Sequence, residues 1–216
     1  MPSEYEPLFA ERRAAAADLE TVQELFRAAG APYLRSFWSW LAWALVLPAA
    51  ALATPPVLAR FGPAGTLLTW SAAILLGGAV ELAAIRSARA VAAGRPGAEP
   101  EAPAPGRSPL ATWALRTQGN LSLVALALSS LLLWQDLAWA LPGMWLLLLG
   151  HSFYLLGGIA FPPFRTYGLL YQLGGVAALW PGGVPLPAFA LTTAAANLWM
   201  GYTVWREGRG PEAPNQ

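Results

Sequence analysis

The chain has 216 residues, of which 56% are hydrophobic and 12% are charged, and its mean hydropathy is +0.45. Soluble domains carry about 25% charged residues, so this composition excludes an ordinary water-soluble domain and predicts an all-α polytopic membrane protein. A net charge of +1 argues against nucleic-acid binding, and the lack of cysteine excludes disulfides, thiolate metal sites and iron–sulfur clusters.

The first 36 residues precede any long apolar run and predict a cytoplasmic amphipathic helical segment. From Glu4 to Ala29, apolar residues recur at helical spacing between charged ones. The acids of this segment outnumber its arginines, so it is not a polybasic lipid anchor. No small-residue cleavage site follows the first apolar run, so we do not expect a removable signal peptide. We expect the segment to dock on the cytoplasmic face of the protein or on a partner.

Six apolar stretches follow, and a membrane-spanning helix needs about 20 apolar residues. The predicted spans cover residues 37–53, 64–85, 110–134, 138–161, 167–180 and 186–205. Spans 1 and 2 form the region 37–93, a Pro- and Gly-rich cytoplasmic loop covers 94–109, spans 3 to 6 form the region 110–205, and 206–216 is a cytoplasmic tail. Pro55 and Pro56 are expected to end the first span, and the fifth is short for a straight crossing.

The arginines predict the orientation. If the N-terminus is cytoplasmic, only Arg60 falls outside and the other twelve of the 13 basic residues fall inside, as the positive-inside rule requires. The tryptophans fit belts at the two membrane surfaces, with Trp38 and Trp205 at the inner one and Trp134, Trp139 and Trp180 at the outer one. The sequence therefore predicts six transmembrane helices with both termini inside. All 13 basic residues are arginine, which together with the abundant alanine, glycine and proline indicates a guanine- and cytosine-rich bacterial genome, so we expect a bacterial inner membrane.

Glu81 lies about one turn inside the inner end of the second span. A carboxyl group there costs at least about 2.5 kcal/mol unless it is paired, hydrated or protonated. Arg116, which enters the third span from the same side, is the natural partner, and Arg86 and Arg165 are alternatives. Two interpretations stay open: a structural ion pair between helices, and a proton or ligand site.

Three further polar residues fall near the middle of predicted spans. His151 lies in the fourth span, Gln172 in the fifth and Asn197 in the sixth. Polar groups at the bilayer midplane seek each other or a ligand. Interhelical hydrogen bonds that set the packing, a pocket for a small ligand or ion, and axial ligation of a haem or chlorin by His151 are the three interpretations.

Catalytic patterns are missing from the sequence. It contains no nucleophile with a reachable base, no HExxH motif, no phosphate-binding loop in the right context and no acidic cluster. We therefore expect a non-enzymatic protein without a metal or another cofactor. The tetrapeptide LLGG occurs at residues 75–78 and 155–158, which predicts close helix packing and leaves a duplicated hairpin possible.

Three segments carry a resemblance to a known type of protein. They are DLETVQELFRAAGAPYLRSFWSWLAWALVLPAAAL, HSFYLLGGIAFPPFRTYGLLYQLGGVAAL and NLWMGYTVWRE. The chain resembles a family of uncharacterised small six-span bacterial inner-membrane proteins, in which a short acidic helix runs into the first span and a Pro- and Arg-bearing turn precedes a short Gly-rich span. The resemblance implies the topology and no activity. Such proteins often carry His where Asn197 stands, which speaks against a metal or haem role at that position.

Three functional hypotheses follow. The leading one is an accessory or regulatory subunit of a membrane complex, with the lipid bilayer and a protein partner or a second copy as its contacts. The second is a small permease or membrane-embedded sensor that uses His151, Gln172 and Asn197, with Glu81 as a proton acceptor. The third is a pigment- or haem-bearing subunit of an electron-transfer complex.

Overall fold

The computed structural model describes residues 36–93, 109–159 and 161–208, together with Thr21. These residues are almost entirely helical, which confirms the all-α class. The elements are α2 (Phe37–Ala93), α3 (Pro109–Trp134), the short 3₁₀ helix η1 (Ala138–Ala140), α4 (Leu141–Ile159), α5 (Pro163–Leu179) and α6 (Pro185–Gly208). The predicted amphipathic segment and the loop 94–109 lie almost wholly outside the described residues, as does most of the tail 206–216.

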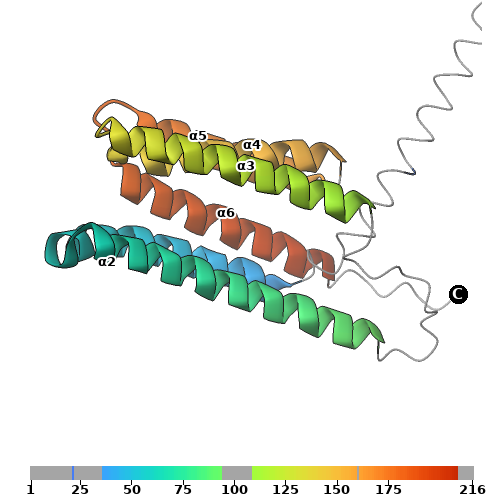
Figure 1. Ribbon diagram of the computed structural model, residues 1–216. Coiled ribbons are helices and arrows are strands. Elements are labelled where there is room, and N and C mark those ends of the chain that lie inside the picture. Colours follow the sequence, from blue (N-terminus) through green and yellow to red (C-terminus); the bar gives the residue numbers. More distant parts are fainter. Residues whose placement is uncertain (1–20, 22–35, 94–108, 160, 209–216) are drawn as a thin grey trace, which may run out of the picture.

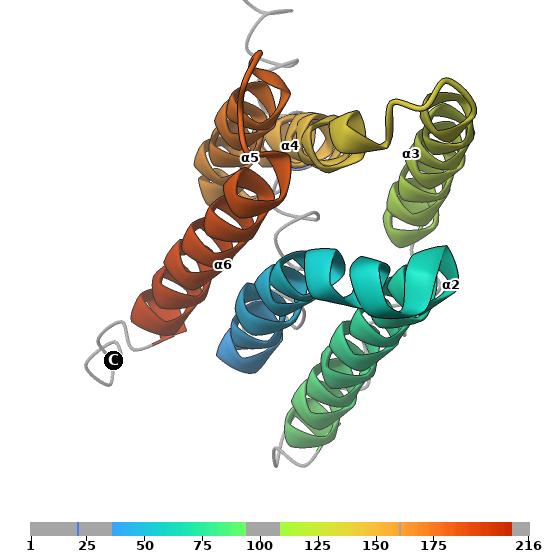
Figure 2. The same cartoon turned by 90° about the vertical axis from the view of Figure 1, so that its left-hand side faces the viewer.

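Two helices joined at Gly62 make up α2, which folds back on itself as a hairpin (Figure 2). We call residues 37–61 its first arm and residues 63–93 its second arm. The predicted end before Pro55 and Pro56 is wrong, because helical geometry continues through both prolines. The chain reverses where Gly62 takes a φ of 68°, a left-handed conformation that glycine adopts without strain, and Pro63 then starts the second arm.

The helices run along a common direction, as Figure 1 shows, and most of their packing involves a few neighbouring pairs. The tightest pair is α4 with α5; α6 packs against α5 on one side and against α2 on the other. Beside α4, α3 lies at the edge of the bundle (Figure 2). Both the start of α2 and the end of α6 lie at the same end of the molecule (Figure 1).

Glycines bring α4 and α5 into backbone contact. Gly143, Gly150 and Gly157 recur every seven residues on α4, and Gly168 and Gly175 have the same spacing on α5. A Cβ atom on Gly150 would lie 2.7 Å from the carbonyl oxygen of Gly168, and one on Gly175 would lie 2.9 Å from that of Gly143. The seven-residue period keeps the glycines on one helix face, so the two helices approach more closely than side chains would allow.

Two helical stretches among the described residues are long and apolar enough to cross a bilayer, Phe37–Ala84 and Ala138–Gly158, and Gly119–Trp134 is a shorter apolar helix. These stretches indicate association with a membrane. The six crossings predicted from the sequence are not supported by this criterion, because the other helices do not meet it.

Candidate functional site

The most polar part of the interior lies between α5 and α6. Tyr167 and Tyr171 are one helical turn apart on α5, and Asn197 faces them from α6. All three are buried, with at most 2% of their surface exposed. The Tyr167 hydroxyl donates to Asn197 Oδ1 at 2.8 Å, and Asn197 Nδ2 donates to the Tyr171 hydroxyl at 2.9 Å. The two hydroxyl oxygens lie 3.1 Å apart.

These contacts form a closed ring of hydrogen bonds. Since Tyr167 gives its single hydroxyl hydrogen to Asn197, the 3.1 Å contact is made by the hydrogen of Tyr171. The second hydrogen of the Asn197 amide goes to the carbonyl oxygen of Thr193, 2.7 Å away. Every donor of the two tyrosines and the asparagine is therefore used, so the ring can tie α5 to α6 but has no donor left for a ligand.

Aromatic side chains from three helices enclose the ring. Phe153 of α4 lies 4.7 Å from the Tyr167 ring centroid, and Trp40 of α2 lies 5.4 Å from it, both edge-on. Phe164 of α5 touches both of them, with centroid distances of 5.6 Å to Phe153 and 6.1 Å to Trp40. Among the described residues, Trp40 Nε1 is the one buried side-chain nitrogen or oxygen without a hydrogen-bond partner. The cluster joins α2, α4, α5 and α6 into one core.

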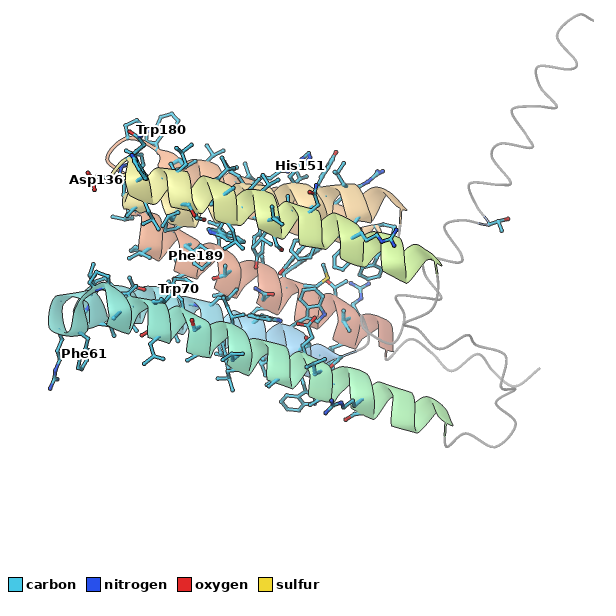
Figure 3. All side chains as sticks on the ribbon, viewed as in Figure 1. Phe61, Trp70, Asp136, His151, Trp180 and Phe189 are labelled. Carbon is cyan, nitrogen blue, oxygen red and sulfur yellow. The ribbon has the colours of Figure 1, made fainter. Side chains whose placement is uncertain are left out.

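His151 and Gln172 lie at the depth of this ring but do not join it. Gly150, the residue before His151, lies beside Gly168 and Gln172. His151 itself is exposed on the face of α4 that points away from the other helices (Figure 3). Gln172 is half-buried in the contact between α4 and α5. The structure thus brings Asn197 together with two tyrosines. His151, Gln172 and Asn197 lie at a similar depth along their helices, as predicted, but they do not contact one another as a group.

Glu81 has a partner within its own hairpin. Trp43 Nε1 of the first arm donates to Glu81 Oε2 at 3.2 Å. The indole also covers Gly77, where a Cβ atom would lie 2.5 Å from the Trp43 ring. The first LLGG sequence therefore makes room for an indole. The second makes room for the start of α5, since a Cβ on Gly157 would clash with the Phe164–Arg165 backbone.

The expected ion pair between Glu81 and Arg116 is not formed. Within the described part of the chain, no salt bridge joins Glu81 to Arg116, Arg86 or Arg165, and all three arginines are exposed. The physical reason is the order of the helices: α3, which carries Arg116, packs mainly against α4 and η1.

Apolar residues line the open depression beside the α5–α6 turn. Its walls include Leu173, Trp180 and Leu191, and no charged side chain contributes to it. Thr192 is the one polar side chain in its lining, so this surface is mostly apolar and has few groups that could orient a polar substrate. The described residues also contain no group of three or more His, Asp or Glu side chains placed to hold a metal ion.

Sequence reasoning missed Tyr167 and Tyr171. Their four-residue spacing places them on one face of α5, together with Phe164, and this signal was available in the sequence. Comparisons of the chain with protein-family models, with curated proteins and with solved structures found no match.

Proposed function

We propose that this protein is a non-enzymatic, multi-pass protein of the bacterial inner membrane that acts as an accessory or regulatory subunit through helix contacts with a protein partner. It crosses the membrane six times and keeps both termini on the cytoplasmic side. The observation that carries the proposal is that each of the described helices α2 to α6 exposes large apolar side chains while the hydrogen-bonded ring of Tyr167, Tyr171 and Asn197 lies inside.

The exposed apolar surface supports a lipid environment. Each of the five α-helical elements has a leucine that is more than half exposed: Leu68, Leu123, Leu155, Leu173 and Leu191. In water, apolar surface costs about 25 cal/mol per Å², and soluble proteins rarely expose such wide apolar patches. In hydrocarbon this cost disappears, whereas Asn197 and Thr193 gain from being buried and hydrogen-bonded.

The path of the chain supports six crossings. The apolar stretch Phe37–Ala84 has 48 residues, and a straight helix of that length would measure about 72 Å at 1.5 Å per residue, more than twice the hydrocarbon thickness of about 30 Å. The turn at Gly62 divides it into two arms that each suit one crossing. Arg165 and Arg206 lie near the helix ends that share one side of the bundle, and Arg60, beside the Gly62 turn, lies at the other.

The edge position of α3 supports a role in association. Of its side chains that the structure describes, only Ala125 is buried. A helix that contacts its own protein along one stripe has most of its surface available for lipid or for another protein.

Purification from native membranes in lipid discs tests the proposal. We expect the discs to contain a second polypeptide in fixed ratio to this chain, retained through repeated chromatography and identified by mass spectrometry. Discs that contain no second polypeptide would contradict the proposal, and uptake or binding of a small solute by such discs would support the permease hypothesis instead. Among the described residues, His151 and Asn197 do not share a site, because His151 is exposed on α4 and the donors of Asn197 are all used within the ring, so the permease and haem hypotheses have less support.

A further inference from the structure

One stripe of α3 contacts the rest of the protein. Ala125 is 1% exposed, and Leu121, Ser129 and Leu132 are half-buried. These residues lie within about 40° of Ala125 around the helix, since each residue advances by about 100°. Ser129 accepts a hydrogen bond from Trp145 of α4, so this stripe faces α4.

A second stripe lies on the opposite face, about 180° from Ala125, and repeats with alternating steps of four and three residues. We call it the α3 seam, and it consists of Arg116, Asn120, Leu123, Ala127, Ser130 and Trp134. All six are exposed, and Figure 2 shows α3 at the edge of the bundle, with α4 on one side. Steps of four and three residues form the heptad pattern by which one helix packs along another.

Asn120 is the informative residue of the α3 seam. It lies near the middle of α3, its side chain is exposed, and it forms no hydrogen bond with any other described residue. A carboxamide that faces hydrocarbon at this depth leaves its donors and its acceptor unsatisfied, which costs free energy that a partner helix can recover. The exposed leucines of the second arm of α2, Leu68 and Leu75, are apolar and need no such partner in lipid.

We propose that the α3 seam binds the α3 seam of a second copy of this chain, in a parallel pair around a two-fold axis along the membrane normal. This inference rests on the proposed function and names one of its contacts. All copies of one chain insert with the same orientation, so a symmetric pair places each seam residue opposite itself. A carboxamide both donates and accepts, so Asn120 complements its own copy.

The other seam residues fit this pairing. Ala127 and Ser130 are small and allow two helices to approach closely. The hydroxyl of Ser130 donates to the Leu126 carbonyl of its own helix at 3.0 Å, so it needs no further acceptor. Arg116 lies near the cytoplasmic end of α3, where two guanidinium groups extend to the headgroups and apart from each other.

The test uses the lack of native cysteine. Single cysteines are placed by Ala127→Cys, within the α3 seam, and by Leu126→Cys, a position that is also exposed but lies about 100° away around the helix. In native membranes under mild oxidation, we expect Ala127→Cys to form a disulfide-linked species of twice the chain mass. Leu126→Cys should form at least about fivefold less of this disulfide-linked dimer. A disulfide requires Cα atoms within about 7 Å, and position 126 points away from the paired helix.

A second set of variants tests Asn120 in the Ala127→Cys background. At limiting expression, Asn120→Leu should lower the yield of the disulfide-linked dimer by about three- to tenfold. This is the change in association that the loss of one interhelical polar contact produces. Asn120→Gln keeps the carboxamide and should restore most of the yield. Leu75→Ala, on the exposed face of the second arm of α2, should leave the yield unchanged and controls for general changes in lipid exposure.

Equal cross-linking of Ala127→Cys and Leu126→Cys, or none from either, would overturn the self-pairing. So would a cross-linked product whose mass shows a different polypeptide on the α3 seam, although that result would support the proposed accessory function. Conversely, a disulfide-linked homodimer with no second polypeptide in the lipid discs would support the α3 seam and contradict the accessory role.

Discussion

The indole nitrogen of Trp145 donates a hydrogen bond to the hydroxyl of Ser129, 3.1 Å away. The pair repeats the contact between Trp70 and Thr54, which has the same length and the same separation of 16 residues. In both pairs the hydroxyl also donates to the carbonyl four residues before it in its own helix. Each hydroxyl is thus both donor and acceptor, and each pair fixes the alignment of two consecutive antiparallel helices.

Removal of this hydroxyl should loosen α3. Ser129→Ala leaves Trp145 Nε1 without its acceptor, and we expect a loss of about 1 kcal/mol in the free energy of unfolding. Thermal unfolding of the purified protein in lipid discs measures the effect. Ser130→Ala is the matched control, because Ser130 bonds only to the backbone of its own helix and is exposed. Equal losses for the two variants would show that the interhelical bond contributes nothing.

The ring between α5 and α6 should behave as a coupled unit. Asn197→Leu and Tyr171→Phe each leave a buried polar group unsatisfied, and we expect each to cost about 1–3 kcal/mol of stability. The double variant should cost less than the sum of the two, since both changes break the same hydrogen bond. Tyr202→Phe, on the exposed face of α6, serves as the control. Additive losses would contradict the closed ring.

The adjacent glycines of the first LLGG sequence should respond in opposite ways. Gly77→Ala places a methyl group 2.5 Å from the Trp43 ring, which should separate the two arms of α2, weaken the bond from Trp43 to Glu81 and cost about 1–3 kcal/mol. A Cβ on Gly78 meets nothing within 4 Å, so Gly78→Ala should raise stability by up to about 1 kcal/mol through helix propensity. Thermal unfolding of the two variants distinguishes them, and equal effects would contradict the indole contact.

The orientation of the chain is open to a labelling test. Arg60→Cys and Asp136→Cys should react with a membrane-impermeant maleimide added to intact cells, whereas Arg206→Cys should react only after the cells are broken. All three residues are exposed. Labelling of Arg206→Cys from outside would overturn both the six crossings and the cytoplasmic placement of the termini.

The sequence predicted most helices because apolar runs and their breaks are local signals. The end of the first arm was misplaced because two prolines weaken a helix locally but need not end it, and the reversal depended on the backbone of Gly62.

The partners of the polar residues could not be predicted in the same way. The position of a residue along a predicted membrane span gives its depth in the bilayer. The similar depth of His151, Gln172 and Asn197 could therefore be predicted from the sequence. The position along a span does not give rotation about the helix axis or the order of neighbours, which decide that His151 is exposed and that Glu81 contacts Trp43 rather than Arg116. Asn120 was passed over because its importance depends on which face of α3 meets α4.

The glycine contacts make the packing of α4 against α5 much tighter than the packing of α3 against α4. Where backbones touch, few side-chain rotamers can adjust, so we expect α4 and α5 to move as one body, which the aromatic cluster extends to α6 and the first arm of α2. Outside this body, α3 is attached along a single stripe. A change in the contacts of α3 would therefore require fewer side-chain rearrangements in the interior than a change in those of α4 or α5.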